Sequence, residues 1–540
     1  MKMINMKKSK AQNRFSLFFS FLFILPFTYS PLLAGDKNIL KISTNPEVIY
    51  QTIDGFGASD AWSAQFLGKN WPVEKRTKAA DLLFSKEFDA SGKPRGIGLS
   101  IWRFNLAAGT TEQGDSSLIG NPWRRGDCFL NRDGSYNWTK QEGQRWFLEA
   151  AKARGVEKFL AFSNSPPVYY TKNGKGFAPK GEIHLNLKPG FMDDYSKYLV
   201  DVIDHFNREG IFFDYVSPVN EPQWNWDNGG QEGTPALNEE IYNLVRYLSH
   251  DLSSRGLKTK IVIGEAGSIG HACMTMDIMG LKSDGRDNQS QFFFSKDSPF
   301  YIADFPNVEK TISAHSYQSV WPVDKQMEYR MMLNSKIKQA NPYLGYWMSE
   351  YCILEKNDEI GGGGGRDLTM KTALYVARII HNDLTLANAK SWQWWTAISA
   401  VDFKDGLLYL VNSPKGDIGK PGGVVENLQN NGELKESKLL WVLGNYSRFI
   451  RPGMVRVKCE LSGNQSPEDG RLLISAYKDP KNGGLLYVIT NLSENNLIVD
   501  FCQEGKAQTY TTDEARDMGF SLQKMNKVDI PHRSVVTVLF

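Results

Sequence analysis

Short apolar segments alternate with amphipathic stretches along most of the chain. Three of the amphipathic stretches, residues 193–209, 238–254 and 369–387, have apolar side chains at helical spacing, and a glycine follows each of the first two at residues 210 and 256. The apolar segments predict eight β-strands, at residues 52–56, 97–105, 156–163, 213–220, 260–264, 311–316, 344–350 and 391–396. Strands and helices in alternation favour parallel βαβ units.

Eight such units predict an α/β fold, a (β/α)8 TIM barrel with long loops, over residues 51–440. A doubly wound parallel sheet is the alternative. It would need a glycine-rich dinucleotide turn after the first strand, and that turn is absent in the required form. The glycine tract at residues 361–365 lacks the Lys-Ser/Thr ending of a phosphate loop, so the sequence disfavours nucleotide binding.

The C-terminal hundred residues follow a different pattern. Four short segments alternate apolar and polar residues, at 472–477, 485–492, 496–501 and 528–540, and a strong turn signal lies at 479–484. They predict an antiparallel β-sandwich over residues 441–540. Residues 35–50 are expected to join it as an N-terminal strand.

The N-terminus has the pattern of a secretory signal peptide. Lysines and one arginine precede an apolar run at residues 15–27, and small residues follow at 34–35. A membrane anchor is the alternative, but the run is shorter than the ~20 residues that span a bilayer. The sequence therefore predicts cleavage after residues 1–34, a secreted or periplasmic protein, and no stable membrane insertion.

Charge and cysteine content exclude several classes of function. The 540 residues include 63 Lys and Arg and 60 Asp and Glu, a formal net charge of +3 that gives no basic field for nucleic acid. The five cysteines lack a CxxC metal spacing. A pair between Cys459 and Cys502 and a set of free thiols both remain open. Neither pattern indicates an oligomeric state.

Polar residues at the carboxyl ends of the predicted strands are the candidate site residues, because barrel active sites lie at that face. They are Asp60, Arg103, Asn105, Asn220, Glu221, His315, Tyr317, Glu350, Trp394 and Trp395.

Two glutamates stand out among these residues. Glu221 lies in the sequence Val-Asn-Glu-Pro-Gln-Trp and Glu350 in Met-Ser-Glu-Tyr. Taken singly, a glutamate at a strand end is more often a salt-bridge or capping residue. As a pair facing one pocket, they match the needs of glycoside hydrolysis, in which one carboxyl donates a proton and the other stays ionised.

These residues resemble a clan of retaining (β/α)8 glycosidases and, within it, glycoside hydrolase family 30. The resemblance runs from Asp54 to the C-terminus. Its motifs are residues 54–62 (DGFGASDAW), 103–105 (RFN), 220–222 (NEP), 315–317 (HSY), 349–350 (SE) and 443–453 (LGNYSRFIRPG).

The resemblance implies a role for each matching residue. Glu221 is expected to be the general acid/base and Glu350 the nucleophile, with Asn220 on the sugar 2-hydroxyl. Arg103 and Tyr317 are expected to hydrogen-bond Glu350, which keeps a nucleophile ionised.

Three further residues are expected to support the site. His315 would orient its neighbours, with a buried core histidine as the alternative. Asp60 would contact sugar hydroxyls, with a strand cap as the alternative, and Asn105 would support the site beside Arg103. The implied reaction needs no metal and no organic cofactor.

Aromatic residues make up 12% of the chain and could stack on sugar rings. The candidates near strand ends are Trp62, Trp102, Trp123, Trp224, Trp226, Trp321, Tyr351 and Trp395. Packing is the alternative for each of them, and it is favoured for Trp102 inside its apolar run. Stacking is favoured for Trp224 and Trp226, which lie in a polar loop.

Within the family the chain looks most like the branch acting on β-1,6-linked galactan, which includes exported proteins of gut bacteria. Residues 163–167 lack a tryptophan that better-known branches often carry. We therefore expect a secreted retaining endo-β-1,6-galactanase acting on a plant-type oligo- or polysaccharide. The alternatives are a β-1,6-glucanase, a xylanase, an exo-acting β-glucosidase, β-xylosidase or β-fucosidase, and, remotely, a non-catalytic carbohydrate-binding protein.

Overall fold

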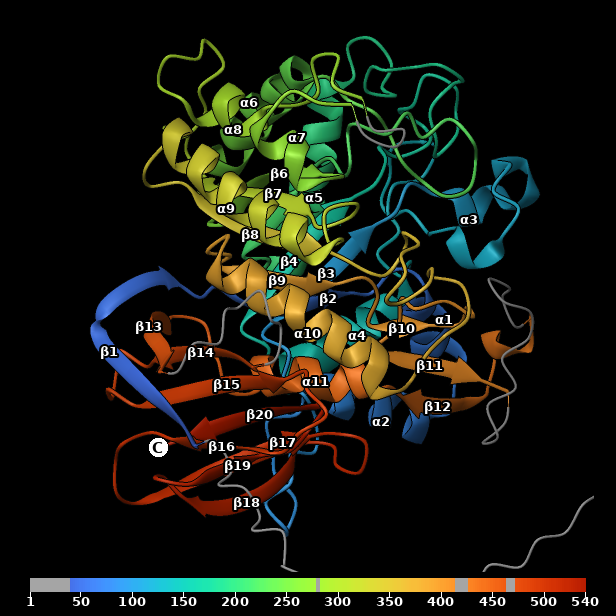
Figure 1. The fold of residues 1–540 in the computed structure, drawn as a ribbon. Coiled ribbons are helices and arrows are strands. Elements are labelled where there is room, and N and C mark those ends of the chain that lie inside the picture. Colours follow the sequence, from blue (N-terminus) through green and yellow to red (C-terminus); the bar gives the residue numbers. More distant parts are fainter. Residues whose placement is uncertain (1–38, 278–281, 413–425, 463–471) are drawn as a thin grey trace, which may run out of the picture. The chain divides into compact units, whose positions relative to one another are not determined.

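The computed structural model describes residues 39–277, 282–412, 426–462 and 472–540. The predicted signal peptide lies outside these residues. Eight parallel strands close into a barrel in sequence order, as the sequence predicts (Figure 1). They are β2 (Gly55–Ser59), β3 (Ile101–Leu106), β4 (Lys158–Ser163), β5 (Tyr215–Ser217), β6 (Lys260–Ala266), β7 (Val308–His315), β8 (Gly345–Glu350) and β9 (Ser391–Trp394).

Helices follow the strands and cover the outside of the barrel (Figure 1). They are α1 (Ser63–Asn70), α2 (Val73–Phe84), α3 (Thr110–Gln113), α4 (Glu142–Ala153), α5 (Met192–Arg208), α6 (Asn238–Ser254), α7 (Ile269–Cys273), α8 (Gln289–Phe294), α9 (Val323–Ala340), α10 (Met370–Thr385) and α11 (Lys438–Ser447). The three helices that the sequence predicts are α5, α6 and α10. Tyr198, Leu199, Val202 and Phe206 of the predicted stripe on α5 are buried.

The first, second and fourth barrel strands differ from the prediction, the second because it begins at Ile101 and not at residue 97. Residue 52 ends a long strand, β1 (Ile39–Thr52), and the barrel strand begins only at Gly55. β5 is three residues long because Pro218 has no N–H for the ladder and Glu221 adopts a φ of 45°. The chain therefore leaves the sheet before the predicted end at residue 220.

Side chains fill the barrel interior in layers. Ile101, Leu160, Tyr215, Val262 and Trp347 form one buried cluster. Tyr215 and Trp347 meet edge to face with ring centroids 4.8 Å apart. Side chains alternate across a strand, so Arg103 lies on the same face as Ile101, one layer nearer the carboxyl ends.

The C-terminal sheet has nine strands in the order β18-β17-β20-β15-β14-β13-β1-β16-β19. They are β1, β13 (Val455–Ser462), β14 (Leu472–Lys478), β15 (Leu485–Asn491), β16 (Leu497–Asp500), β17 (Lys506–Thr512), β18 (Gly519–Lys524), β19 (Val528–Ile530) and β20 (Ser534–Leu539). Leu40, Val457, Ile489, Val499 and Val538 share one buried core, which makes the unit sandwich-like. All pairings are antiparallel except that of β1 with β16, which is parallel.

Helix α11 connects the barrel to this sheet. It begins after Ser437, whose hydroxyl accepts a hydrogen bond from the Leu440 N–H at 3.1 Å. Asn445 donates to the Tyr510 carbonyl at 2.8 Å and to the Thr537 hydroxyl at 3.0 Å. The motif at residues 443–453 therefore supplies buried contacts between the two parts. The domain limits given from the sequence stay a prediction.

A small third sheet follows the barrel. Strands β10 (Ile398–Ser399), β11 (Leu408–Val411) and β12 (Glu433–Glu436) form it in that order. The sequence does not predict it, because strands of two to four residues carry too little periodicity. The loop between β10 and β11 contributes Val401, Phe403 and Asp405 to the cavity described below.

Two expectations about the whole chain can be compared with the described residues. In that part of the chain no helix is long and apolar enough to cross a membrane. All five cysteines are free, so Cys459 and Cys502 do not pair. Cys128, Cys273 and Cys352 are buried, and Cys502 is exposed.

Candidate active site

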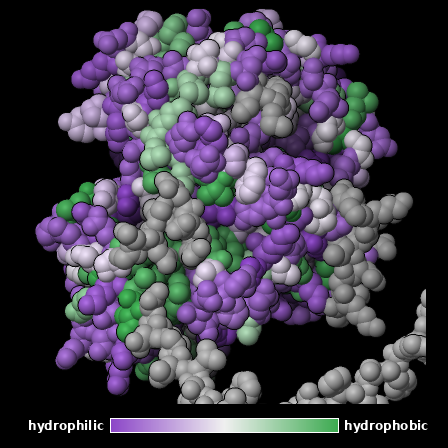
Figure 2. Space-filling model, viewed as in Figure 1, coloured by the Kyte–Doolittle hydropathy of each residue, from purple (hydrophilic) through white to green (hydrophobic). Residues whose placement is uncertain are grey.

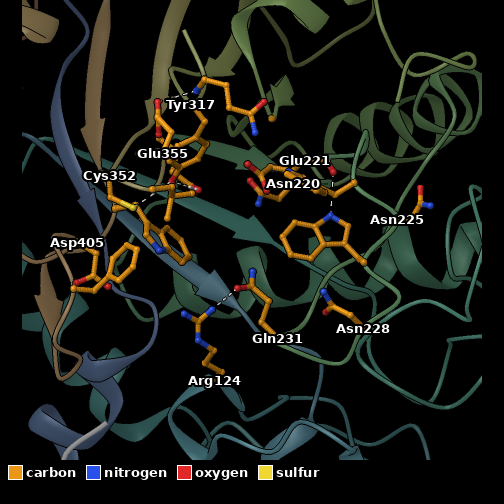
Figure 3. A pocket seen from close by; sticks show the side chains of 18 of the residues that line it. Arg124, Asn220, Glu221, Asn225, Asn228, Gln231, Tyr317, Cys352, Glu355 and Asp405 are labelled. Atoms are coloured by element: carbon orange, nitrogen blue, oxygen red, sulfur yellow. Dashed lines mark hydrogen bonds between the residues drawn. The ribbon is translucent and has the colours of Figure 1, made fainter. Parts of the chain in front are cut away.

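A cavity of about 810 Å³ opens where the barrel strands end. Among its lining residues are Asn220, Glu221, Trp224, Trp226, Tyr317, Glu350 and Trp395. Figure 3 shows that Glu221, Asn220 and Asn225 lie on one side of it, and that Cys352 and Asp405 lie on the other. The face of the molecule seen in Figure 2 is largely hydrophilic.

Glu221 and Glu350 lie close together, although the chain separates them widely. Glu350 ends β8, and Glu221 follows β5. One carboxylate oxygen of each, with one nitrogen of His315, forms a group of atoms that all lie within 4.8 Å of one another. The inverting arrangement needs ~6.5–9.5 Å between the carboxyls, so the spacing fits the retaining one at ~5–5.5 Å.

Glu350 lies among donors. Its Oε2 accepts a hydrogen bond from Nη1 of Arg103, and its Oε1 accepts one from the Tyr317 hydroxyl at 3.1 Å. Nδ1 of His315 lies 3.6 Å from Oε1. The guanidinium of Arg103 also lies 3.9 Å from the centroid of the Phe162 ring. A fixed cation and a hydroxyl donor therefore hold both oxygens of the Glu350 carboxylate in place.

Glu221 has a different environment. Its Oε1 lies 2.8 Å from Nδ1 of His315, and its side chain is 8% exposed. Burial raises the pKa of the Glu221 carboxyl, and the neighbouring His315 opposes that shift without cancelling it. The Glu221 carboxyl therefore keeps its proton to a higher pH than a free glutamate does, whereas Glu350 is surrounded by donors, which is the asymmetry that glycoside hydrolysis needs.

The backbone of Glu221 is held in a left-handed conformation, which is unusual for a residue other than glycine. Its N–H donates to the Glu265 carbonyl at 2.8 Å. Its carbonyl accepts the indole N–H of Trp226 at 3.0 Å. Glu265, near the end of β6, and Trp226, in the loop after β5, therefore fix the direction in which the Glu221 side chain leaves the backbone.

Asn220 and Arg103 are in direct contact. Oδ1 of Asn220 accepts a hydrogen bond from Nη2 of Arg103 at 3.0 Å. The amide group thereby has a fixed orientation, and Asn220 lines the cavity beside Glu221.

His315 and Glu265 form the layer beneath the carboxyl pair. Nε2 of His315 lies 3.1 Å from Oε2 of Glu265, and the same oxygen accepts a hydrogen bond from Nη2 of Arg103 at 2.8 Å. Burial disfavours the charged imidazole, but Glu350, Glu221 and Glu265 outweigh it and raise the pKa of His315 to about 10.

The sequence patterns do not single out Glu265. Burial alone would raise the pKa of this carboxyl, but Arg103 and His315 outweigh it and lower the pKa to about 2. The residue directly follows the apolar run of a barrel strand, so the strand-end argument would have found it. The Val262 side chain lies in the barrel interior, so strict alternation would point residue 264 inward and Glu265 outward. The β6–β7 pairing shifts register near this point and Glu265 has a φ of 41°, which turns its side chain inward.

Asp60 and Asn105 do not line the cavity. Oδ1 of Asp60 accepts the Asn105 N–H at 2.9 Å, so the strand-cap alternative describes its contact. Burial raises the pKa of the Asp60 carboxyl to about 7. Oδ1 of Asn105 accepts a 3.4 Å hydrogen bond from Asn164. Both side chains therefore lie in the packed layer around Arg103.

The aromatic candidates divide into two groups. Trp224, Trp226 and Trp395 line the cavity, and Trp62 meets Trp395 edge to face at 5.1 Å. The others pack in the protein or lie outside the lining: Trp102 and Tyr351 are fully buried, Trp123 is 5% exposed, and Trp321 and Trp394 are not among the lining residues.

Long loops supply lining residues that no motif predicts. Arg124 follows β3 and donates to Oε1 of Gln231 at 2.6 Å. Its guanidinium lies 5.0 Å from the centroid of the Trp62 ring. Among the described lining residues it is the one basic side chain, whereas Asp227, Glu355 and Asp405 add carboxyls to the catalytic pair.

Glu221, His315 and Glu350 are also the described side chains close enough together to share a metal ion. Both ring nitrogens of His315 already contact carboxylates. That donor set suits a proton-sharing network.

A barrel with two close, buried carboxyls at its carboxyl-end rim has the arrangement of a glycoside hydrolase. The sequence model of O-glycosyl hydrolase family 30 matches residues 39–409. The chain therefore belongs to O-glycosyl hydrolase family 30 and is an O-glycosyl hydrolase.

Three relatives illustrate the similarity. An endo-β-1,6-galactanase from Hypocrea rufa is 26% identical over 430 residues, which cover 76% of this chain and 75% of the relative. A conserved exported protein from Bacteroides fragilis is 36% identical, with a TM-score of 0.85 over 93% of this chain and 100% of that one. Xylanase C from Talaromyces cellulolyticus shares the fold at 21% identity, with a TM-score of 0.64 over 92% of this chain and 99% of its catalytic domain.

Proposed function

We propose that the protein is an exported retaining β-glycanase that cleaves β-1,6-galactan within the chain. The observation that carries the mechanism is the spacing of the Glu221 and Glu350 carboxyls, which leaves no room for a water between them as an inverting enzyme requires. The substrate rests on the resemblance to the galactan-acting branch and on the relative named endo-β-1,6-galactanase.

The first step transfers the glycosyl group to the protein. The protonated Glu221 carboxyl gives its proton to the glycosidic oxygen while an oxygen of Glu350 attacks the anomeric carbon. The carbon–oxygen bond to the leaving sugar breaks, and its electron pair stays on the protonated oxygen. A covalent glycosyl ester on Glu350 results.

The second step returns the protein to its starting state. Ionised Glu221 removes a proton from a water molecule, whose oxygen attacks the anomeric carbon from the face that the leaving sugar occupied. The ester bond to Glu350 breaks, and two inversions give net retention. Arg103 and Tyr317 contact the Glu350 carboxylate and stabilise it each time its charge returns.

Asn220 and the cavity aromatics position the sugar in this scheme. The amide of Asn220 contacts the 2-hydroxyl, a hydrogen bond that strengthens as positive charge develops at the anomeric carbon. Trp224, Trp226 and Trp395 offer flat faces to the apolar side of sugar rings. The aromatic lining suits a neutral polysaccharide.

Export is part of the proposal. It is supported by the signal-peptide pattern of residues 1–34 and by the likeness to a protein titled as exported. Expression of the full chain in a Gram-negative host, followed by N-terminal sequencing, should give a mature protein that begins near residue 35. An intact N-terminus in the cytoplasmic fraction would contradict this part.

Product analysis tests the substrate. Incubated with β-1,6-galactan, the protein should release oligosaccharides of mixed length at the earliest times, and the new reducing ends should form first as the β-anomer. Release of monomer alone would show exo action. Activity confined to β-1,6-glucan or glucuronoxylan would overturn the galactan assignment and keep the mechanism.

A further inference from the structure

Among the described residues, Glu265 is the one fully buried carboxylate that contacts both supports of the catalytic pair. Its Oε2 accepts hydrogen bonds from Arg103 at 2.8 Å and His315 at 3.1 Å. Arg103 in turn contacts Glu350, and His315 contacts Glu221. The carbonyl of Glu265 also accepts the N–H of Glu221. A single residue is therefore tied to both carboxyls through three separate contacts.

We propose that Glu265 is a positioning residue, which holds Arg103 against the nucleophile and His315 against the acid/base. This inference rests on the proposed function. Arg103 and His315 have exposed fractions of 1% and 0%, so no water replaces a lost partner. Without the Glu265 carboxylate, two buried cations would share the remaining carboxylates, and each would move toward them.

The charges around the pair make the proposal measurable. When Glu221 is protonated, Glu265 and Glu350 carry two negative charges, and Arg103 and His315 carry two positive ones. Removing the Glu265 charge leaves the cluster with one net positive charge. Loss of a further proton then becomes easier, whichever group releases it.

The other groups that face this cluster remain the same in such a variant. Asp60, which follows β2, interacts electrostatically with Arg103. Its own titration near pH 7 occurs in the wild type and in every variant. Tyr317 follows β7 and Cys352 follows β8, and both lie beside Glu350. Burial is the main cause that raises the pKa of each well above its usual range. Both stay neutral through the range of the measurement.

The test compares Glu265→Gln and Glu265→Asp with a matched control. Asp383→Asn removes a carboxylate that is equally buried and equally paired with a buried arginine, Arg330, at 2.8 Å. It does not line the cavity. The rates are measured from pH 4 to pH 10 on a glycan that the wild type hydrolyses, so the test does not depend on that glycan being galactan.

For Glu265→Gln we expect kcat to fall by about 10–100-fold, the size of effect that the loss of a hydrogen bond to a charged group has on a rate, with KM changed little. The alkaline limb of the kcat/KM profile should move to lower pH. Glu265→Asp keeps the charge on a shorter side chain, so the alkaline limb should return toward the wild-type position even if kcat stays low. Asp383→Asn should lower thermal stability and leave the alkaline limb of the kcat/KM profile at the wild-type pH.

The possible outcomes separate the two proposals. An unchanged alkaline limb in a folded Glu265→Gln variant overturns the positioning role, and so does the same shift in Asp383→Asn. If Glu265→Gln does not fold, Glu265→Asp decides: a wild-type limb with reduced kcat supports the role, whereas wild-type kcat and limb overturn it. A wild type without glycosidase activity would instead refute the proposed function.

Discussion

The indole N–H of Trp226 donates to the backbone carbonyl of Glu221 at 3.0 Å. An aromatic residue of the cavity lining thereby also holds the peptide of the proposed acid/base. Trp226 itself has a positive φ of 52°, and its ring packs on Gly233, where an added Cβ would lie 2.3 Å from the indole Cδ2. Substrate contact and acid placement therefore depend on the same side chain.

Replacing Trp226 should affect both binding and catalysis. In Trp226→Ala the loss of stacking, worth ~0.5–1.5 kcal/mol, raises KM by about 3–10-fold, and the loss of the hydrogen bond lowers kcat as well. Trp224→Ala is the matched control, because its indole makes no such bond to Glu221; it should raise KM alone. Steady-state kinetics decide, and equal effects in both variants would contradict the link.

Tyr317→Phe should reduce kcat with little change in KM. The hydroxyl donates to Oε1 of Glu350 at 3.1 Å, and a hydrogen bond to a charged group is worth ~1.5–3 kcal/mol, or about 10–100-fold in rate. Tyr446→Phe removes another buried hydroxyl, which contacts Thr490 in the C-terminal sheet. That control should keep the wild-type kcat. Equal losses in both variants would mean that Tyr317 acts only through stability.

Substitution of Trp102 and of Trp395 should distinguish a packing role from a substrate-binding role. Trp102 is fully buried and meets Phe84 edge to face at 4.8 Å, so Trp102→Ala should cost about 3–5 kcal/mol of unfolding free energy. The folded fraction should keep the wild-type KM. Trp395→Ala should instead raise KM, with a smaller loss of stability. Urea unfolding and kinetics on the same samples test both, and an increased KM in Trp102→Ala would restore its role as a subsite.

Stability should depend on pH through Glu265 and His315. The pKa of Glu265 is depressed to about 2, so its stabilising effect is full above its unfolded value of 4.5 and is lost as pH falls toward 2. The pKa of His315 is raised to about 10, so its effect is full below 6.5 and is lost as pH rises through 10. Both effects are complete between about pH 4.5 and 6.5.

Urea unfolding of Glu265→Gln beside the wild type measures the first effect. The difference in unfolding free energy should be largest above pH 4.5 and shrink toward pH 2. Glu232→Gln is the control of opposite sign, because burial raises the pKa of Glu232 to about 7 and its ionisation destabilises the fold at higher pH. A difference for Glu265→Gln that does not change with pH would contradict the depressed pKa.

The sequence predicts the barrel well because its strands are buried on both faces. Short segments rich in apolar residues mark all eight, and the carboxyl-end rule is enough to place Glu221 and Glu350 at one rim. The predicted strand bounds are wrong where a proline interrupts the strand or where a neighbouring strand includes the residues. Pro218 shortens β5, and β1 absorbs residue 52 through its pairing with β13.

The remaining site residues depend on features that a sequence pattern does not carry. Glu265 has one sequence signal, its position directly after the apolar run of β6. Alternation alone would point its side chain outward, and it turns inward near an irregularity in the β6–β7 pairing. Arg124 and Asp405 come from loops without periodicity, so their meeting at the cavity follows from long-range packing alone. Asp60 lies at the predicted strand end, but its side chain accepts the Asn105 N–H and does not line the cavity.

Trapping with a 2-deoxy-2-fluoro glycoside that has a good leaving group tests the central claim most directly. Because the fluorine slows both steps and the activated leaving group speeds the first, the covalent intermediate should accumulate. The intact protein should gain the mass of one fluoroglycosyl group, and peptide mapping should place it on Glu350, with none formed in Glu350→Gln. Label on another residue, or turnover by folded Glu350→Gln at the wild-type rate, would contradict the account.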